Sequence, residues 1–275
     1  MSAPEPGRHG QADGLRIALY QYAARDEAMD ARLGQLDDAA RRAAEEGAHV
    51  LITPEMFLSG YSVPADRIRA AAEPADGPGA RAVAAIARRH GLAVVYGFPE
   101  RDGARIHNAA QCIDAAGLTR AHHRKIRLAG PGERMVYAGG RGAEPVFELA
   151  GFRLSLLICY DVEFPELVRA RALAGAELLV VPTALVTEHP FVAHHMVPTR
   201  AFENGIFVAY VNYAGFEGDA DYLGESTLSG PEGEDRARAD DRESLLIADV
   251  ERGRIERARA TLPYLDDARD LAGPG

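Results

Sequence analysis

A cysteine, a glutamate and a lysine each stand at the end of a predicted strand of this 275-residue chain. Cys159 ends FRLSLLIC, Glu55 ends AHVLITPE and Lys125 ends LTRAHHRK. Open α/β sheets present ligand-binding side chains at such strand ends. A thiol with a pKa of ~8.5 is mostly protonated at neutral pH, so a nucleophilic cysteine needs a base or a cation beside it. Glu55 and Lys125 could supply both.

Spacing alone leaves a purely structural role open for each of these residues. Core packing would account for a buried Cys159, a solvated cap for Glu55, and a charge at the end of a hairpin for Lys125. Cys112, inside RIHNAAQCID, is expected to be a core or sheet residue. A histidine is the more common base for a cysteine nucleophile, but none stands at a clear strand end. The histidines in question are His107, His122, His123, His189, His194 and His195.

The histidine pairs also raise the question of a metal site. Adjacent histidines on a strand point to opposite faces, and no Cys or carboxylate lies at the spacing of the usual zinc motifs. We therefore expect no metal.

Alternating apolar patterns predict a layered α/β fold around these three residues. The predicted strands are residues 15–22, 48–55, 92–98, 105–114, 118–125, 152–159, 177–183 and 206–213, with a terminal β segment in 224–230 and 244–250. The predicted helices are residues 26–47, 79–91, 165–176 and 194–205. Segments 105–114 and 118–125 form an antiparallel hairpin, and residues 260–275 lack clear periodicity.

Composition limits the partners and the cellular location. Residues 1–14 are rich in Pro, Gly and polar groups and are expected to be a disordered tail, followed by a single domain over 15–275. No apolar run is long enough to span a bilayer, and two cysteines are too few for a disulfide framework, so a cytoplasmic protein is expected. A net charge of -10 disfavours nucleic acid and favours a neutral or cationic small molecule.

Four motifs in order resemble the nitrilase superfamily of carbon-nitrogen hydrolases. PEMFLSGY carries Glu55, HRKIRLAGPGER carries Lys125 and Glu133, and LLICYDVEFPE carries Cys159. The resemblance extends from LRIALYQ to PYLDDAR and includes GESTLSGPEG. It implies an α-β-β-α sandwich that needs no cofactor and forms a homodimer or a higher homo-oligomer through helices.

The same resemblance implies roles for the residues. Glu55 would be the general base, Cys159 the nucleophile that forms a thioester, and Glu133 a support for Lys125 or the substrate. Lys125 and the backbone N–H of Tyr160 would bind the oxyanion. From the residues alone, Glu133 in a Gly-rich loop could equally be an exposed acid.

The motifs CYDVEFPE, YGFPER, VPTA and PYLDDAR look most like the amidase branch that includes 5-aminopentanamidase. This resemblance implies hydrolysis of a small linear aliphatic amide, such as an ω-amino amide, with Thr183 of VPTA among the substrate-binding residues. Glu163, helped by Asp161, would favour a cationic or neutral substrate over an anionic one. A structural or solvated acid at a helix N-terminus is the competing interpretation of Glu163.

Three alternatives remain for the activity. Two share the same chemistry: a nitrilase, and an N-carbamoyl amine or amino acid amidohydrolase. The third belongs to another class, a catalytically silent homologue that binds a ligand or a partner.

Overall fold

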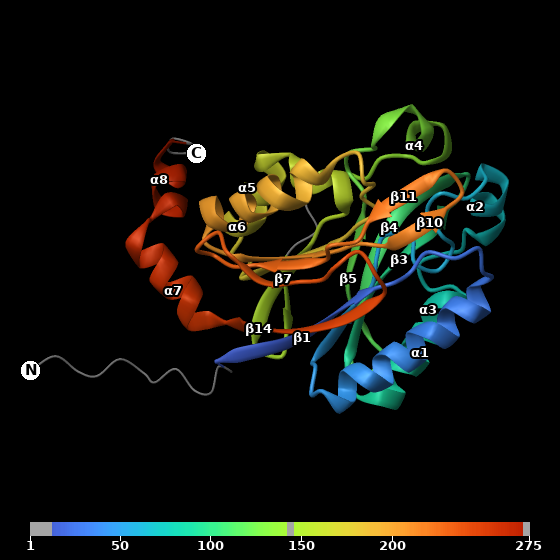
Figure 1. Ribbon diagram of the computed structural model, residues 1–275, viewed down its shortest axis with the longest axis horizontal. Helices are drawn as coiled ribbons and strands as arrows, with labels where there is room; N and C mark the ends of the chain where they lie inside the picture. Colours follow the sequence, from blue (N-terminus) through green and yellow to red (C-terminus); the bar gives the residue numbers. More distant parts are fainter. Residues whose placement is uncertain (1–12, 142–145, 272–275) are drawn as a thin grey trace, which may run out of the picture.

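The computed structural model describes residues 13–141 and 146–271, and Figure 1 shows how their elements are arranged. The first strand begins at Gly14, which pairs with Glu251. Residues 1–12 of the predicted tail lie outside the described residues. In the described part of the chain, no helix has both the length and the apolar character needed to cross a bilayer.

Two large sheets form the centre of the fold. The first has the strand order β14-β1-β2-β3-β4-β5. Its strands are β1 Gly14–Gln21, β2 Val50–Ile52, β3 Ala93–Asp102, β4 Arg105–Ile113, β5 Thr119–Arg124 and β14 Ser244–Glu251. β1, β2 and β3 are parallel, whereas β3, β4 and β5 form an antiparallel meander that includes the predicted hairpin.

The second sheet has the order β13-β12-β9-β8-β7-β6, and a separate two-stranded sheet joins β10 to β11. Their strands are β6 Phe147–Leu149, β7 Phe152–Leu156, β8 Leu178–Pro182, β9 Phe207–Val211, β10 Ala214–Glu217, β11 Ala220–Leu223, β12 Thr227–Ser229 and β13 Asp235–Arg238. β7, β8 and β9 are parallel.

The described helices are α1 Met29–Glu45, α2 Ala65–Ala71, α3 Pro78–His90, α4 Gly130–Val136, α5 Pro165–Leu173, α6 Val197–Asn204, α7 Arg252–Thr261 and α8 Tyr264–Leu271. Helices α1 and α3 cover the outer face of the first sheet, and α5 and α6 cover that of the second (Figure 1). A 3-10 turn, Cys159–Glu163, precedes α5, and a π-helical turn, Val192–Met196, precedes α6.

Three apolar cores separate the layers. Along β1, Ile17 and Leu19 face the core between the sheets, whereas Ala18 and Tyr20 face the core under α1 and α3, as the alternation of a strand requires. A third core lies between the second sheet and α5 and α6. The four layers confirm the predicted α-β-β-α sandwich (Figure 1).

Cys112 belongs to the core between the sheets. It is fully buried, and burial raises the pKa of its thiol to about 12. This is the placement that its position in a predicted strand favoured.

Three segments differ from the sequence-based expectation. The Gly-rich segment after Lys125 contains the helix α4, and the segment from Arg252 onward, which lacks clear periodicity beyond residue 260, forms α7 and α8. The terminal β segment is divided: β12 and β13 extend the second sheet, whereas β14 pairs with β1 of the first.

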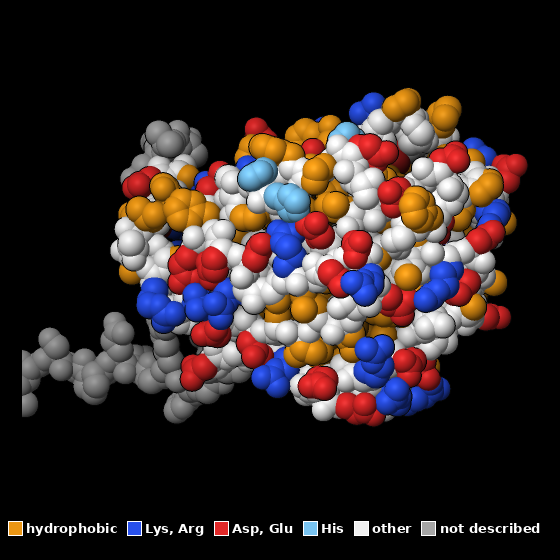
Figure 2. All heavy atoms as spheres, viewed as in Figure 1, with side chains coloured by type: hydrophobic (Ala, Val, Ile, Leu, Met, Phe, Trp, Pro, Cys, Tyr) orange, Lys and Arg blue, Asp and Glu red, His pale blue; other side chains and the backbone are white. Residues whose placement is uncertain are grey.

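The outer surface carries charges of both signs. On the face drawn in Figure 2, acidic and basic side chains are interspersed. A binding site for nucleic acid would instead concentrate lysine and arginine on one face.

The connection after β2 lies against the backbone of β3. Met56 has a φ of 53°, and a Cβ atom added to Gly97 would lie 2.3 Å from Met56 N and 2.9 Å from Glu55 C. Only a glycine allows this approach, because any side chain at residue 97 would push against backbone atoms. Gly97 therefore leaves the space that the position of Glu55 requires.

We predict that Gly97→Ala lowers the free energy of unfolding by about 1–3 kcal/mol, the usual cost of overpacking, and also reduces activity by displacing Glu55. Gly34→Ala is the matched control, because Gly34 lies inside α1 with no atom within 4 Å of an added Cβ. It should raise stability by about 0.5–1 kcal/mol. Urea unfolding measures both values; equal effects of the two substitutions would contradict the close approach.

Candidate active site

Lys125 lies between two carboxylates in the protein interior. Its Nζ donates to Glu55 Oε1 at 2.7 Å and to Glu133 Oε1 at 2.6 Å. Lys125 and Glu55 are fully buried, and Glu133 is 7% exposed. The three predicted residues therefore form one hydrogen-bonded group.

The surroundings keep Lys125 charged. Burial alone would lower the pKa of its ammonium, but the charges of Glu55 and Glu133 outweigh burial and raise that pKa well above its usual value. A lysine inside a protein stays protonated when carboxylates compensate for its lost hydration. A permanent cation is thus available at the site.

The topology explains how Glu55 and Lys125 meet. β5 runs in the same direction as β2, since two antiparallel pairings separate it from β3, which is parallel to β2. The carboxyl ends of β2 and β5 therefore lie at the same end of the first sheet. Glu55 and Lys125 follow these ends.

The two carboxylate oxygens of Glu55 differ in their hydrogen bonds. Oε1 accepts from Lys125 and, at 2.6 Å, from Asn108 Nδ2, whereas the buried Oε2 has no hydrogen-bond partner among the described residues. Burial and the charge of Glu133 raise the pKa of this carboxyl, against the opposing effects of Lys125 and Asn108. Such a carboxylate is a stronger proton acceptor than an exposed one.

Glu133 is a buried acid, which excludes its interpretation as an exposed one. Its Oε1 accepts from Tyr61 Oη at 2.9 Å, and its Oε2 accepts from the backbone N–H of Ala129 at 2.5 Å. Glu217 in turn accepts from the Tyr61 N–H at 2.8 Å. Glu133 is therefore fixed from several directions and can hold the Lys125 ammonium in place.

Cys159 stands on a sharp turn at the end of the second sheet. It is 8% exposed, has a φ of 43° and begins the 3-10 turn after β7. A non-glycine residue in this region costs about 1–3 kcal/mol and is often found at functional sites. The backbone N–H of Tyr160 lies in the first turn of this short helix, where amide groups have no intrahelical acceptor.

The thiol of Cys159 is in the electrostatic field of the charged group. Burial and Glu55 raise its pKa well above the usual value, whereas Lys125 and a hydrogen bond from the Ala184 backbone act in the opposite direction. Cys159 therefore holds its proton at neutral pH.

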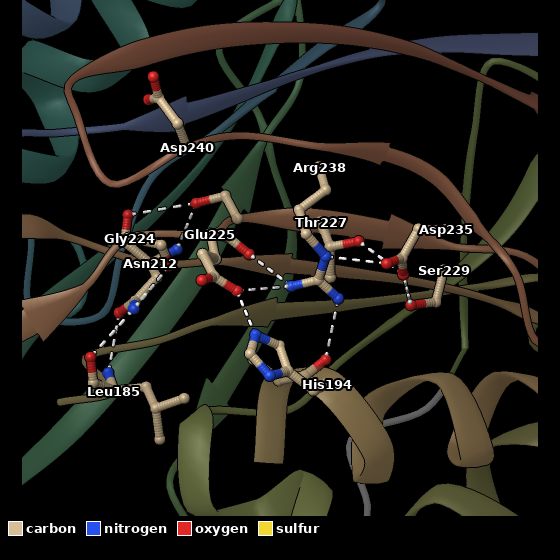
Figure 3. A network of polar contacts seen from close by, with 12 residues as sticks. Leu185, His194, Asn212, Gly224, Glu225, Thr227, Ser229, Asp235, Arg238 and Asp240 are labelled. Atoms are coloured by element: carbon tan, nitrogen blue, oxygen red, sulfur yellow. Dashed lines mark hydrogen bonds and ion pairs between the residues drawn. The ribbon is translucent and has the colours of Figure 1, made fainter. Parts of the chain in front are cut away.

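The loop that carries Ala184 is held by Asn212, as Figure 3 shows. Asn212 Oδ1 accepts the Leu185 N–H at 2.8 Å, and its Nδ2 donates to the carbonyls of Leu185 and Gly224, both at 3.0 Å. The same figure shows Arg238 joined to Glu225, which also pairs with His194. The Asn212 contacts hold the segment after β8, in which the Ala184 backbone contacts Cys159.

Thr183 contacts Glu55 through its backbone. Its carbonyl accepts the Glu55 N–H at 3.2 Å, and its buried hydroxyl donates to the Val181 carbonyl at 3.2 Å. Its predicted contact with substrate stays a prediction.

Glu163 and Asp161 have different surroundings, although both are in the turn after Cys159. Glu163 is half-buried, and burial raises the pKa of its carboxyl while His189, Lys125 and Arg200 act to lower it. Asp161 is fully buried, and protein donors occupy both of its oxygens. A direct effect of Asp161 on a substrate is therefore not supported.

The paired histidines bind carboxylates on opposite faces of β5. His122 Nε2 lies 2.8 Å from Glu100 and His123 Nε2 lies 3.1 Å from Asp161. Within residues 13–141 and 146–271, no three His, Cys, Asp or Glu side chains gather as metal ligands.

A surface hollow of about 410 Å³ lies beside the Cys159 turn. It is lined by Ile126, Arg127, Leu128, Arg134, Gly139, Tyr160 and Phe164. Arg127 lies over the ring of Phe164, with its guanidinium carbon 5.6 Å from the ring centre. The segment after Lys125 and the segment after Cys159 thus line the same hollow.

Sequence reasoning missed three groups of this site. Asn108 is a polar residue within an apolar strand, which is a signal in itself. Tyr61 lies in the same motif as Glu55 but gives no separate signal. The Ala184 contact is made by the backbone, so no side chain could have revealed it.

Comparisons with known proteins identify the family of this chain. The carbon-nitrogen hydrolase family model matches residues 16–260. A curated relative from Pseudomonas protegens, named "Hydrolase in pqqF 5'region", is 43% identical over 257 residues, which are 93% of this chain and 89% of the relative. An (R)-stereoselective amidase from a Pseudomonas species is 30% identical and covers 93% of this chain and 92% of its own.

Solved structures of an amidase from Nesterenkonia sp. are similar as well. One has a TM-score of 0.79 and 38% identity, and covers 90% of this chain and 95% of that chain. Another, of a variant with 37% identity and a TM-score of 0.78, covers 90% of this chain and 98% of that chain and shows Michael addition of acrylamide at the active-site cysteine. This chain belongs to the carbon-nitrogen hydrolase family of the nitrilase superfamily, and is a hydrolase of its amidase type.

Proposed function

We propose that the protein hydrolyses a small linear aliphatic amide to a carboxylate and ammonia through a thioester on Cys159. The observation that carries this proposal is the buried array of Glu55, Lys125 and Glu133 in the field of a cysteine that keeps its proton. The array supplies a base, a cation and a support, and requires no cofactor.

Acylation begins with a proton transfer from the Cys159 thiol to the free oxygen of Glu55. The thiolate attacks the carbonyl carbon, and the electron pair of the C=O bond moves to oxygen. Lys125 and the Tyr160 N–H then stabilise the oxyanion. When the oxyanion collapses, the C–N bond breaks and Glu55 gives its proton to the leaving nitrogen, so ammonia departs and a thioester remains.

Deacylation uses the same groups. A water molecule gives a proton to Glu55 and attacks the thioester carbonyl. The second oxyanion collapses with cleavage of the C–S bond, and the proton on Glu55 returns to the sulfur. The product is formed as the carboxylic acid and gives its remaining proton to ammonia or to solvent, so it leaves as the carboxylate and the enzyme regains its initial protonation state.

We further propose an ω-amino amide, such as 5-aminopentanamide, as a substrate. The support is Glu163, a half-buried carboxyl on the same short turn as Cys159, just before α5. A carboxylate near the acyl site attracts an ammonium group and repels a second carboxylate. A cytoplasmic location and a homodimer also stay predictions.

An ammonia-release screen over aliphatic amides, ω-amino amides, carbamoyl compounds and nitriles tests the reaction. We expect ammonia from the amides. Carbon dioxide released together with ammonia would point to a carbamoyl substrate, and consumption of a nitrile to a nitrilase. No turnover of any compound would support a silent homologue.

We predict that Cys159→Ala lowers ammonia release by at least about 10⁴-fold, because it removes the nucleophile. Glu55→Gln keeps the shape of the side chain but cannot accept a proton, and should cost about 10²–10⁴-fold in kcat. Cys112→Ala is the control, since Cys112 lies in the core between the sheets. It should retain the wild-type rate; loss of activity only in that variant would contradict the assignment.

The pH profile should follow Glu55. Because its pKa is raised, the ascending limb of kcat/KM is expected above the ~4.3 of a free glutamate, with activity lost as the pH falls and the base becomes protonated. Glu133→Gln removes a negative charge that raises this pKa, so the limb should move to lower pH. Glu73→Gln, at another buried carboxyl, should leave the limb in place. A limb that moves to higher pH in Glu133→Gln would contradict the coupling.

The role of Glu163 is tested with two substrates of equal length. We predict that Glu163→Gln lowers kcat/KM for 5-aminopentanamide by about tenfold more than for pentanamide, since only the former carries an ammonium group. Steady-state ammonia release gives both values. Equal losses for the two amides would remove the charge argument.

A further inference from the structure

One buried carboxylate joins the lysine segment to the cysteine turn. Asp161 Oδ1 accepts the backbone N–H of Arg127 at 2.7 Å and that of Ile126 at 3.1 Å. Its Oδ2 accepts the N–H of Ile158 at 3.2 Å and lies 3.1 Å from His123 Nε2. The side chain of Asp161 is fully buried.

The groups that contact the Asp161 carboxylate are close neighbours of Lys125 and Cys159 in the sequence. His123, Ile126 and Arg127 surround Lys125 in the sequence, and Ile158 directly precedes Cys159. Lys125 belongs to the end of the first sheet and Cys159 to the end of the second, so no ladder hydrogen bond relates them. Asp161 is a direct polar connection between the two segments.

The connection also holds the unusual backbone of the cysteine. The Asp161 N–H donates to the Ile158 carbonyl at 2.9 Å, while its carboxylate accepts the Ile158 N–H. Asp161 therefore holds both backbone groups of the residue before Cys159. A positive φ at a non-glycine residue persists only where such contacts fix it.

We propose that Asp161 is a positioning residue, which sets the distance and orientation of the Lys125 ammonium relative to the Cys159 sulfur during acyl transfer. This inference rests on the proposed function. It gives Asp161 a role through the backbone, in place of the direct effect on substrate charge that the sequence suggested. Acyl transfer is sensitive to such placement, because a shift of about 1 Å can cost about 10²-fold in rate.

An asparagine is the informative replacement. It keeps one acceptor oxygen for the Ile126 and Arg127 N–H groups, but its NH₂ group then faces the Ile158 N–H, and two donors cannot bond. Asp161→Asn should thus release the cysteine side of the connection. The volume of the side chain stays almost unchanged, so packing alone predicts little effect.

Glu177→Gln is the matched control. Glu177 is also a buried carboxylate, accepting the Arg153 N–H at 2.8 Å and Arg252 Nε at 2.9 Å. It pins the start of β7, whereas Asp161 pins the segment after its end. Both substitutions weaken a buried polar network, but only one lies at the reacting groups.

The experiment measures kcat, KM and Tm for both variants, with the best amide from the screen. We expect Asp161→Asn to lower kcat by about 10²-fold with KM changed less than about threefold. Glu177→Gln should lower Tm and leave kcat unchanged. Equal kcat losses in the two variants, or a wild-type kcat in Asp161→Asn, would overturn the proposal.

A second readout needs no substrate. Alkylation of Cys159 by iodoacetamide is followed by mass spectrometry from about pH 6 up to the highest pH at which the protein stays folded, because the pKa of this thiol is raised well above the ~8.5 of a free thiol. If Asp161→Asn displaces the Lys125 ammonium, the thiolate loses a stabilising cation. The alkylation midpoint, which is the pH of half-maximal alkylation, should then be higher in Asp161→Asn than in the wild type. Mere removal of a negative charge would move it to lower pH, so a lower or unchanged midpoint overturns the proposal.

The two readouts separate failure of this inference from failure of the proposed function. If the wild-type protein hydrolyses no amide, the proposed function fails, and the alkylation midpoint still decides whether Asp161 positions Lys125 against the sulfur. If Asp161→Asn does not fold, His123→Leu removes a single donor and keeps the carboxylate. It should lower kcat several-fold and move the midpoint in the same direction; a wild-type kcat and midpoint in that variant would overturn the proposal.

Discussion

The site depends on one buried ammonium held between two carboxylates. Removing these charges from water costs several kcal/mol for each ion, and direct hydrogen bonds repay this only when the geometry is good. The contacts of Lys125 with Glu55 and Glu133 have that geometry, at 2.7 and 2.6 Å. In proteins, replacing a buried ion pair by well-packed apolar residues of similar volume is often neutral or stabilising. The charges are therefore better explained by chemistry than by stability.

In this arrangement, more groups can carry a negative charge than a positive one. Glu55, Glu133 and the Cys159 sulfur compete for the single positive charge of Lys125, and burial makes every extra negative charge costly. The thiol therefore remains protonated until a proton can move to Glu55. A thiolate and an ionised Glu55 disfavour each other. Transfer of the thiol proton to Glu55 avoids this pair, because it leaves the total charge of the site unchanged. In the proposed mechanism, one carboxyl group therefore serves acylation and deacylation in turn.

The sequence predicted the parts of this site that depend on single segments. Glu55, Lys125 and Cys159 follow recognisable apolar strands, and the layered fold follows from the same patterns. Contacts between segments left no comparable signal: the bonds of Asp161 to backbone groups of distant residues depend on both sheets being in place. The helix α4 was hidden because Gly130, Pro131 and Gly132 open it, and such residues normally indicate a loop.

The two-sheet architecture is what makes the strained backbone of Cys159 tolerable. The positive φ values at Met56 and Cys159 lie on the turns after β2 and β7, one in each sheet, and each turn is held from outside its own segment. Gly97 of β3 leaves room for the first turn, and Asp161 anchors the second to the residues that follow Lys125. Strain in either turn would relax if its support moved, and the base or the sulfur would move with it. The rigidity of the sandwich core is therefore a condition for the chemistry, because the reacting groups come from opposite sheets and no single element could hold them together.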